Sequence, residues 1–300
     1  NAAAIAPEPR AIQIFSIGRV WTIAVSTITH LIRMKIFYFL LVFVVLLLFA
    51  GNISFASSPA QALSTLKKVS FGALDLFAWV FAIVATALLI PRDIEDRTLY
   101  TILSKPVRRV EYLIGKLGGV LLVIAASLAI LFVVSAVMIQ VKEFNYISAE
   151  IGDATAITDE MRQNIGLIEN SGFRPDLALA ALASLMKAAV VAAVSMLLST
   201  FASSSLFTII VSMLVFLVGH AHNMLTNFWL YDTDHNVVVQ LILKLFKVII
   251  PNFQLFSFSE GIVLGEAVSA SLIWQMSGLT GIYLVVFVLL SLLTFVDKEF

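Results

Sequence analysis

Charged side chains are concentrated in one short stretch, residues 91–116, which reads PRDIEDRTLYTILSKPVRRVEYLIGK. Only 13% of the chain is Asp, Glu, Lys or Arg, so this density is unusual. Two kinds of chemistry fit it. The first is a solvated loop whose acids neutralise its bases, and the second is a docking face in which ion pairs surround an apolar centre.

Two further ionisable residues lie in or beside apolar segments. Lys187 lies inside the run 177–200, where a charge is costly unless it faces a cavity, a partner or the membrane surface. Asp75 lies near the start of the run 71–90, where it fits either the outer membrane interface or a gate or substrate contact. We therefore consider Lys187 and Asp75 as candidates for a transport pathway.

The sequence predicts neither catalysis nor metal binding. His220 and His222 point to different sides of a helix because they are two positions apart, which argues against a shared metal. The chain has no Cys and no G-x-x-x-x-G-K-[ST] phosphate-binding motif, and the spacing of its Ser, His and Asp residues does not indicate a catalytic triad. We expect no catalytic residue, no metal site and no cofactor bound by this chain.

The elements that position these residues must lie in a membrane. Hydrophobic residues make up 60% of the chain and 23 residues are Phe, and the mean hydropathy is +1.01. Such a chain has too little polar surface for a soluble globule. The formal net charge is zero, which gives no indication of nucleic-acid binding. Residues 1–10 lack a basic segment followed by an apolar one, so no cleavable signal peptide is expected.

The sequence predicts an all-α, multi-pass protein of the cell (inner or cytoplasmic) membrane, because an apolar helix of roughly 20 residues crosses the hydrocarbon core. The bias of Lys and Arg places both termini in the cytoplasm. Six segments are expected to span the membrane: 36–51, 71–90, 113–141, 177–200, 206–224 and 273–296.

Three further elements are predicted between and before these spans. Residues 11–34 have helical amphipathicity, which fits an interfacial helix or, equally, a helix packed against protein. Residues 142–176 form an external loop or a small helical cap. Residues 237–265 are interrupted by Pro251 and fit an outer re-entrant helical hairpin better than two more spans.

The charged stretch itself predicts a short helix over 93–103 on the cytoplasmic side. Pro91 is expected to end the second span, and Asp93 is a suitable N-cap with Asp96 three residues later. The dipeptide Lys105-Pro106 then breaks this helix, and a new helix begins at Pro106 and runs into the third span.

The segment DIEDRTLYTILSKPVRRVEYLIGK resembles the signature of type 2 ABC (ATP-binding cassette) transporter permeases. The similarity rests on Glu95, Thr98-Leu99, Leu103-Ser104-Lys105-Pro106-Val107 and Gly115-Lys116, in that order and spacing. The segment looks most like permeases of the copper-enzyme-maturation branch. It departs from the pattern at Arg97, where many members carry Gly.

The resemblance implies a function and a set of partners. In this family the 93–103 segment is a coupling helix that docks on a separate ATPase subunit, which supplies ATP and Mg. The chain would be a permease subunit for export or extrusion, paired with a second copy or a homologue and surrounded by membrane lipid. The implied docking residues are Asp93, Ile94, Glu95, Arg97, Thr98, Leu99, Ile102, Leu103, Pro106 and Arg108.

Two other classes of function stay open. An ion-coupled secondary transporter would carry internal repeats and intramembrane charges, whereas this sequence has no repeat and only Lys187 well inside a span. A mechanotransmitting membrane subunit would use ATPase docking without moving a solute, and nothing in the sequence excludes it.

Overall fold

The computed structural model describes residues 15–53, 58–95, 107–152, 158–202, 204–222, 250–266 and 268–296. Within these ranges the regular structure is helical and contains no strand. Five helices are long and apolar enough to cross a membrane, which agrees with a multi-pass, all-α membrane protein. The elements are α1 (Ile17–Arg33), α2 (Lys35–Asn52), α3 (Pro59–Glu95), α5 (Arg109–Ile151), α6 (Asp159–Ser171), α7 (Leu177–Phe201), α8 (Ser205–His220), η1 (Phe253–Phe256), α11 (Phe258–Leu264) and α12 (Ala270–Val296).

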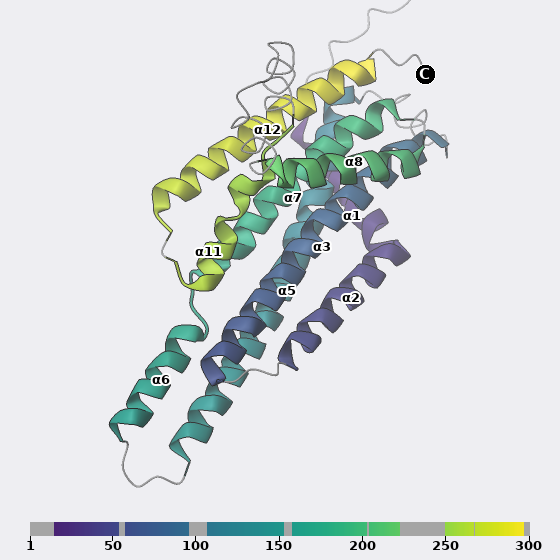
Figure 1. Ribbon diagram of the computed structural model, residues 1–300. Coiled ribbons are helices and arrows are strands. Elements are labelled where there is room, and N and C mark those ends of the chain that lie inside the picture. The colour runs from purple at the N-terminus through teal and green to yellow at the C-terminus, as the bar shows by residue number, and fades with distance from the viewer. Residues whose placement is uncertain are drawn as a thin grey trace, which may run out of the picture.

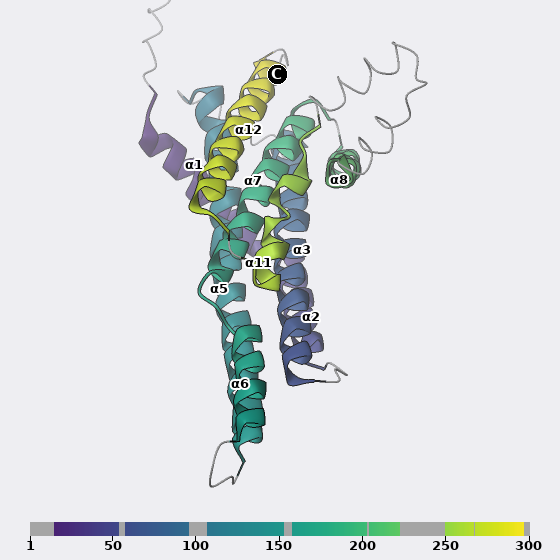
Figure 2. The same cartoon turned by 60° about the vertical axis from the view of Figure 1, so that its left-hand side comes forward.

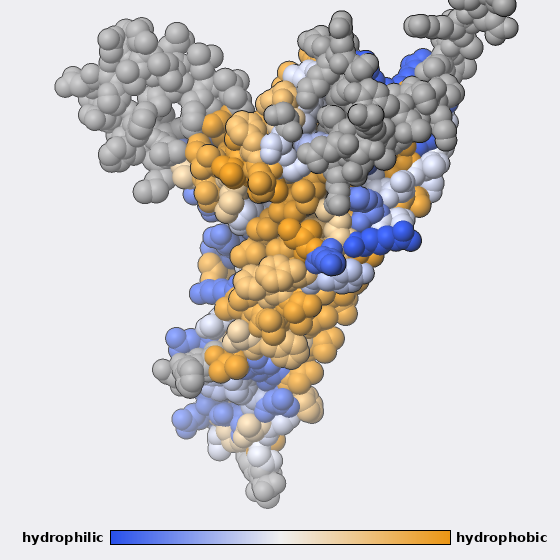
Figure 3. Space-filling model, turned by 90° about the vertical axis from the view of Figure 1, so that its right-hand side faces the viewer, coloured by the Kyte–Doolittle hydropathy of each residue, from blue (hydrophilic) through white to orange (hydrophobic). Residues whose placement is uncertain are grey.

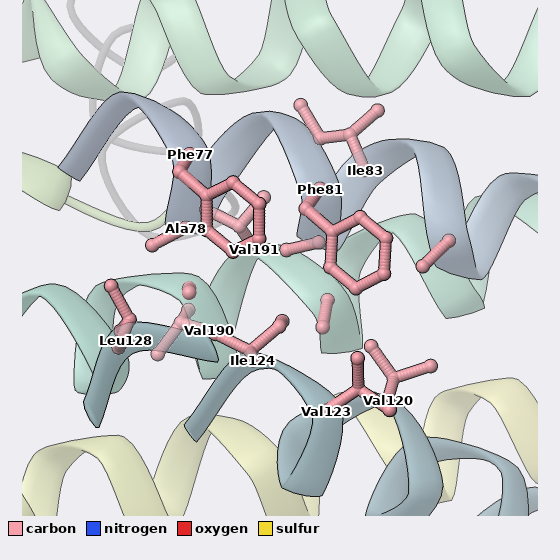
Figure 4. Packing of buried hydrophobic residues seen from close by; sticks show 14 of the residues in the cluster. Phe77, Ala78, Phe81, Ile83, Val120, Val123, Ile124, Leu128, Val190 and Val191 are labelled. Atoms are coloured by element: carbon pink, nitrogen blue, oxygen red, sulfur yellow. The ribbon is translucent and has the colours of Figure 1, made fainter. Parts of the chain in front are cut away.

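Helices α3, α5 and α7 form the centre of the bundle (Figure 1). Helix α7 packs closely on α3 because much of its buried surface is alanine, which lets two helix backbones approach each other. Phe77 and Phe81 of α3 then fill the core beside Ile124 and Leu128 of α5 and Val190 of α7 (Figure 4). The three helices are therefore joined by one continuous apolar core.

Two of these central helices are longer than a membrane is thick. At ~1.5 Å per residue, the 37 residues of α3 and the 43 of α5 extend about 55 and about 65 Å, against a hydrocarbon core of ~30 Å. Figure 1 shows the far end of α5 projecting beyond the bundle beside α6. Both helices must extend past the apolar layer on at least one side.

Helices α2 and α12 lie at the periphery with most of their surface uncovered. Only 28% of the most apolar window of α2 and 17% of that of α12 is buried inside the protein. Figure 3 shows a broad apolar band on one face of the molecule, with hydrophilic residues gathered at its lower end. Such a band is what contact with lipid or with another membrane subunit requires.

Helix α1 packs across α5 through two glycines. A Cβ on Gly115 would lie 2.8 Å from the Cβ of Ile23, and a Cβ on Gly119 would lie 2.7 Å from that of Thr27. The missing side chains therefore allow the two backbones to approach, as in small-xxx-small helix pairs. Of the two interpretations of residues 11–34, packing against protein is present from Ile17 onward, although large apolar residues such as Trp21 stay exposed.

The second predicted span ends later than expected. Helix α3 continues through Pro91 to Glu95, so Pro91 does not terminate it and Asp93 is not an N-cap. A proline inside a helix removes one backbone hydrogen bond, and here that loss does not end the helix. The carboxylate of Asp93 instead contacts the ammonium of Lys116 and the hydroxyl of Tyr112 on α5.

The predicted fifth span, 206–224, is not confirmed as a membrane crossing. Its helix, α8, has 16 residues, fewer than the roughly 20 that a crossing needs. Figures 1 and 2 show α8 running across the bundle, at a large inclination to α3 and α7. An apolar composition alone does not distinguish a crossing helix from one lying over its neighbours.

The two predicted connecting regions contain more helix than a loop would. Within 142–176, α5 continues to Ile151 and α6 folds back beside it, with the Thr158 hydroxyl accepting from the Met161 N–H at the start of α6. Within 237–265, residues 237–249 lie outside the described residues, and the remainder forms η1 and α11. Helix α11 packs against α3 and α7.

Candidate functional site

The predicted docking residues are only partly placed by the structure. Asp93 lies in the last turns of α3, and Arg108 directly precedes α5. Ile94 and Glu95 belong to the end of α3 by their backbone. Residues 96–106 lie outside the described residues, and they include the predicted positions Arg97, Thr98, Leu99, Ile102, Leu103 and Pro106.

The two flanks of this segment are held together by polar contacts. The ammonium of Lys116 lies 2.7 Å from a carboxylate oxygen of Asp93, and the Tyr112 hydroxyl donates to the same oxygen. Tyr112 is fully buried, so this contact is sheltered from water. The chain segment between α3 and α5 is therefore attached at both ends to helices that are held together. We call the contacts of Asp93, Tyr112 and Lys116 the base of this segment.

A buried carboxylate extends that base to α1. Glu111 has no exposed surface, and its two oxygens accept from the Ser16 N–H at 2.8 Å and the Arg108 N–H at 3.0 Å. They also accept from Nε of Arg19 at 2.9 Å and from Nη2 at 2.7 Å. The hydrogen bond to Glu111 raises the pKa of Arg19 further above its ordinary value. Glu111 thus joins the first residues of α1 to the first turn of α5.

A second buried ion pair lies deeper in the bundle and joins α3 to α7. The Nζ atom of Lys187 donates to Oδ2 of Asp75 at 2.8 Å, and Lys187 is 97% buried. The sequence selected both residues separately as pathway candidates, and the structure brings them together. The sequence did not predict that the two residues pair, because they are 112 positions apart in the chain.

This ion pair lines a cavity of about 330 Å³ between α3, α7 and α11. The large apolar residues that line the cavity are Phe71 of α3 and Val263 and Leu264 of α11. Its polar residues are Lys68, Asp75, Ser184, Lys187, Ser259 and Glu260. Asp75, Ser184 and Lys187 are largely covered by protein, whereas Lys68 and Glu260 are exposed.

Sequence reasoning missed the contribution of α11 to this cavity. Ser259 and Glu260 belong to a segment predicted as part of a re-entrant hairpin, and neither was considered as a site residue. The sequence feature that could have indicated this site is Glu260, a carboxylate that lies between two apolar stretches. The structure holds the end of α11 in place through Arg174, which donates to the Gly265 carbonyl oxygen at 2.9 Å.

Helix α3 connects the two polar regions. Asp93 in the base and Asp75 in the cavity are separated by about five helical turns, about 27 Å along a single helix. A displacement of the base would therefore reach the cavity through one continuous element. Among the described residues, no group of three or more His, Cys, Asp or Glu side chains could hold a metal ion.

Comparison with known proteins adds no family assignment. A scan against protein-family models and a search of curated proteins both find no match to this chain.

Proposed function

We propose that the chain is the transmembrane permease subunit of an ABC transporter, coupled to an ATPase on a separate polypeptide. The observation that carries the proposal is the set of polar contacts that holds together the two helix ends flanking residues 96–106 in the chain. Asp93, Tyr112 and Lys116 join α3 to α5, and Glu111 adds α1. A force applied to a charged segment mounted in this way would move three helices together.

The sequence of that segment supports docking to an ATPase. It carries the central part of the motif by which the chain resembles type 2 permeases, Thr98-Leu99 and Leu103-Ser104-Lys105-Pro106, together with the charged residues Asp96, Arg97 and Lys105. Closure of an ATPase dimer would pull on the segment, and α3 would transmit the displacement toward Asp75 and Lys187. The cavity beside that pair is the proposed point of substrate contact, with export as the proposed direction.

The test is purification of the tagged full-length chain from its native membrane, followed by mass spectrometry of co-purifying polypeptides. We expect a partner that carries a G-x-x-x-x-G-K-[ST] motif and hydrolyses ATP with Mg. Glu95→Arg should weaken the complex by about 2–5 kcal/mol, because it replaces a negative charge of the docking face by a positive charge that has no partner there.

The matched control is Glu169→Arg, which makes the same charge change on exposed α6. Normal ATPase recovery with the control and a loss with Glu95→Arg would support the proposal. Equal recovery with both variants, or purification without any ATPase, would contradict it.

A buried ion pair beside a cavity also favours a second candidate, an ion-coupled secondary transporter. Charged residues within membrane segments often mark ion or proton pathways. In proteoliposomes that contain the chain alone, uptake driven by a proton or sodium gradient would select this second function. Uptake that needs both the ATPase and ATP would select the first.

A further inference from the structure

We propose that the cavity between α3, α7 and α11 binds a zwitterionic group, one with a cationic amine and an anionic phosphate or carboxylate on the same molecule. The inference names the substrate class of the cavity. Its role in transport rests on the proposed function, whereas the binding itself requires no ATPase.

The charges of the cavity favour a ligand without net charge. Two lysines, Lys68 and Lys187, are balanced by two acids, Asp75 and Glu260. One cation and one anion lie in the covered part, and one of each lies in the exposed part. A ligand with net charge would leave one charge uncompensated in a poorly solvated place, whereas a zwitterion adds one partner for each sign.

The buried ion pair has hydrogen-bonding capacity left over. An ammonium group carries three N–H donors, and within the described residues Lys187 uses only the one that binds Asp75. Oδ1 of Asp75 is buried and has no hydrogen-bond partner among the same residues. The Asp75 side chain is 25% exposed, and a carboxylate oxygen can accept more than one hydrogen bond, so Oδ2 can keep Lys187 and also accept from a ligand amine.

The remaining surface indicates an organic molecule. Phe71, Val263 and Leu264 contribute apolar surface to the cavity lining, and the cavity volume of about 330 Å³ lies at the lower end of the range for organic ligands. A bare inorganic ion would leave these apolar side chains without contacts. A small zwitterion, or the headgroup of a zwitterionic lipid, can contact the charged and the apolar lining residues together.

Native mass spectrometry of the purified full-length chain tests the inference. The protein is equilibrated with phosphatidylethanolamine, which is zwitterionic, or with phosphatidylglycerol of the same acyl chains, which is anionic. We expect preferential retention of phosphatidylethanolamine. Asp75→Asn and Lys187→Gln should each reduce that retention about tenfold or more, the effect of losing one charge-assisted hydrogen bond.

Glu260→Gln supplies a second variant at an exposed position, where folding is not at risk, and it should reduce retention several-fold by the same principle. Glu169→Gln on α6 is the control and should leave retention unchanged. Displacement of the lipid by soluble phosphoethanolamine would show that a free zwitterion binds, and retention that resists displacement would show that the site takes the lipid. Both outcomes support the inference.

Retention of both lipids to the same extent would overturn it, as would retention that none of the three cavity variants changes. A cavity that holds only water would show as no retention of either probe, and this would also overturn the inference. Because no ATPase is present, such a failure would leave the proposed function standing. Failure of ATPase co-purification would in turn leave a positive binding result intact.

Discussion

The two buried carboxylates Glu111 and Asp75 differ in how completely protein partners satisfy them. Glu111 accepts from two backbone N–H groups and twice from the Arg19 guanidinium, and it is fully buried. Asp75 has one ion-pair partner, one buried oxygen without a partner among the described residues, and a cavity beside it. Glu111, whose oxygens both accept hydrogen bonds from protein, holds segments of the chain together. Asp75, which can still accept a hydrogen bond, is suited to binding a ligand.

The largest expected effect comes from exchanging each carboxylate for its amide. Glu111→Gln should cost about 3 kcal/mol or more of folding free energy, because the amide nitrogen would replace a buried oxygen that accepts from N–H donors and would leave those donors without an acceptor. Asp75→Asn should cost less, about 1–3 kcal/mol, because the cavity gives the remaining Lys187 ammonium access to water or ligand.

Unfolding of both variants in mixed detergent micelles measures this difference. The distinction between a structural and a binding carboxylate would be broken if Asp75→Asn proved the more destabilising. Glu169→Gln, an exposed carboxylate on α6, should stay within about 0.5 kcal/mol of the unmodified chain.

A smaller effect is expected from the glycines that bring α1 against the base. Gly119→Ala would place a Cβ 2.8 Å from the Ala24 carbonyl oxygen, and overpacking of this kind costs about 1–3 kcal/mol. Its neighbour Gly118 has open space around the same position. Gly118→Ala should therefore stabilise α5 by up to about 1 kcal/mol through helix propensity alone.

Thermal unfolding together with proteolysis of α1 distinguishes the two alanine variants. Opposite signs of the two changes in stability are expected. If both variants were stabilised, backbone contact would not hold α1, and Glu111 alone would have to do so.

The smallest effect concerns a third carboxylate, away from both sites. Oε2 of Glu143 on α5 accepts from the Phe173 N–H at 2.9 Å, which ties the residues after α6 back to α5. Glu143→Ala should cost about 0.5–1.5 kcal/mol, the value of one hydrogen bond. Glu143→Gln keeps an acceptor oxygen and serves as the control.

Hydrogen exchange at the Phe173 amide reports this contact directly. Exchange should be faster in Glu143→Ala and nearly unchanged in Glu143→Gln. Slow exchange in both would mean that the hairpin of α5 and α6 is held mainly by other contacts.

The sequence predicted the apolar parts of the long helices because each is marked by a continuous apolar run, but it did not predict that α3 begins at Pro59 or that α5 continues to Ile151. It could not predict where α3 ends, since Pro91 is a local stop signal that the contacts of Asp93 with α5 override. It also assigned a crossing to residues 206–224 from the length of their apolar run. The structure does not confirm that crossing, since the helix described there, α8, has 16 residues and lies at a large inclination to α3 and α7.

The candidate site could be predicted in its members but not in its assembly. Lys187 stands out because a charge within an apolar run needs a partner, but no local pattern indicates Asp75 as that partner. Glu111 was one charge among many in a dense stretch, and its contact with Arg19 joins residues 92 positions apart. Contacts between residues so far apart in the chain depend on which helices pack together, and the hydrophobic periodicity of a single helix does not reveal this.

Met34 is the single non-helical residue between α1 and α2, and its backbone is extended. On one side of it α1 is fastened to α5 by Glu111 and the two glycines, and on the other side α2 packs on α3. Helices α1 and α2 contact each other little. The chain therefore changes direction at one residue, between a helix packed on α5 and a helix packed on α3. Because α3 and α5 share the central apolar core, the backbone angles of Met34 set the angle at which α1 and α2 diverge over one joined body.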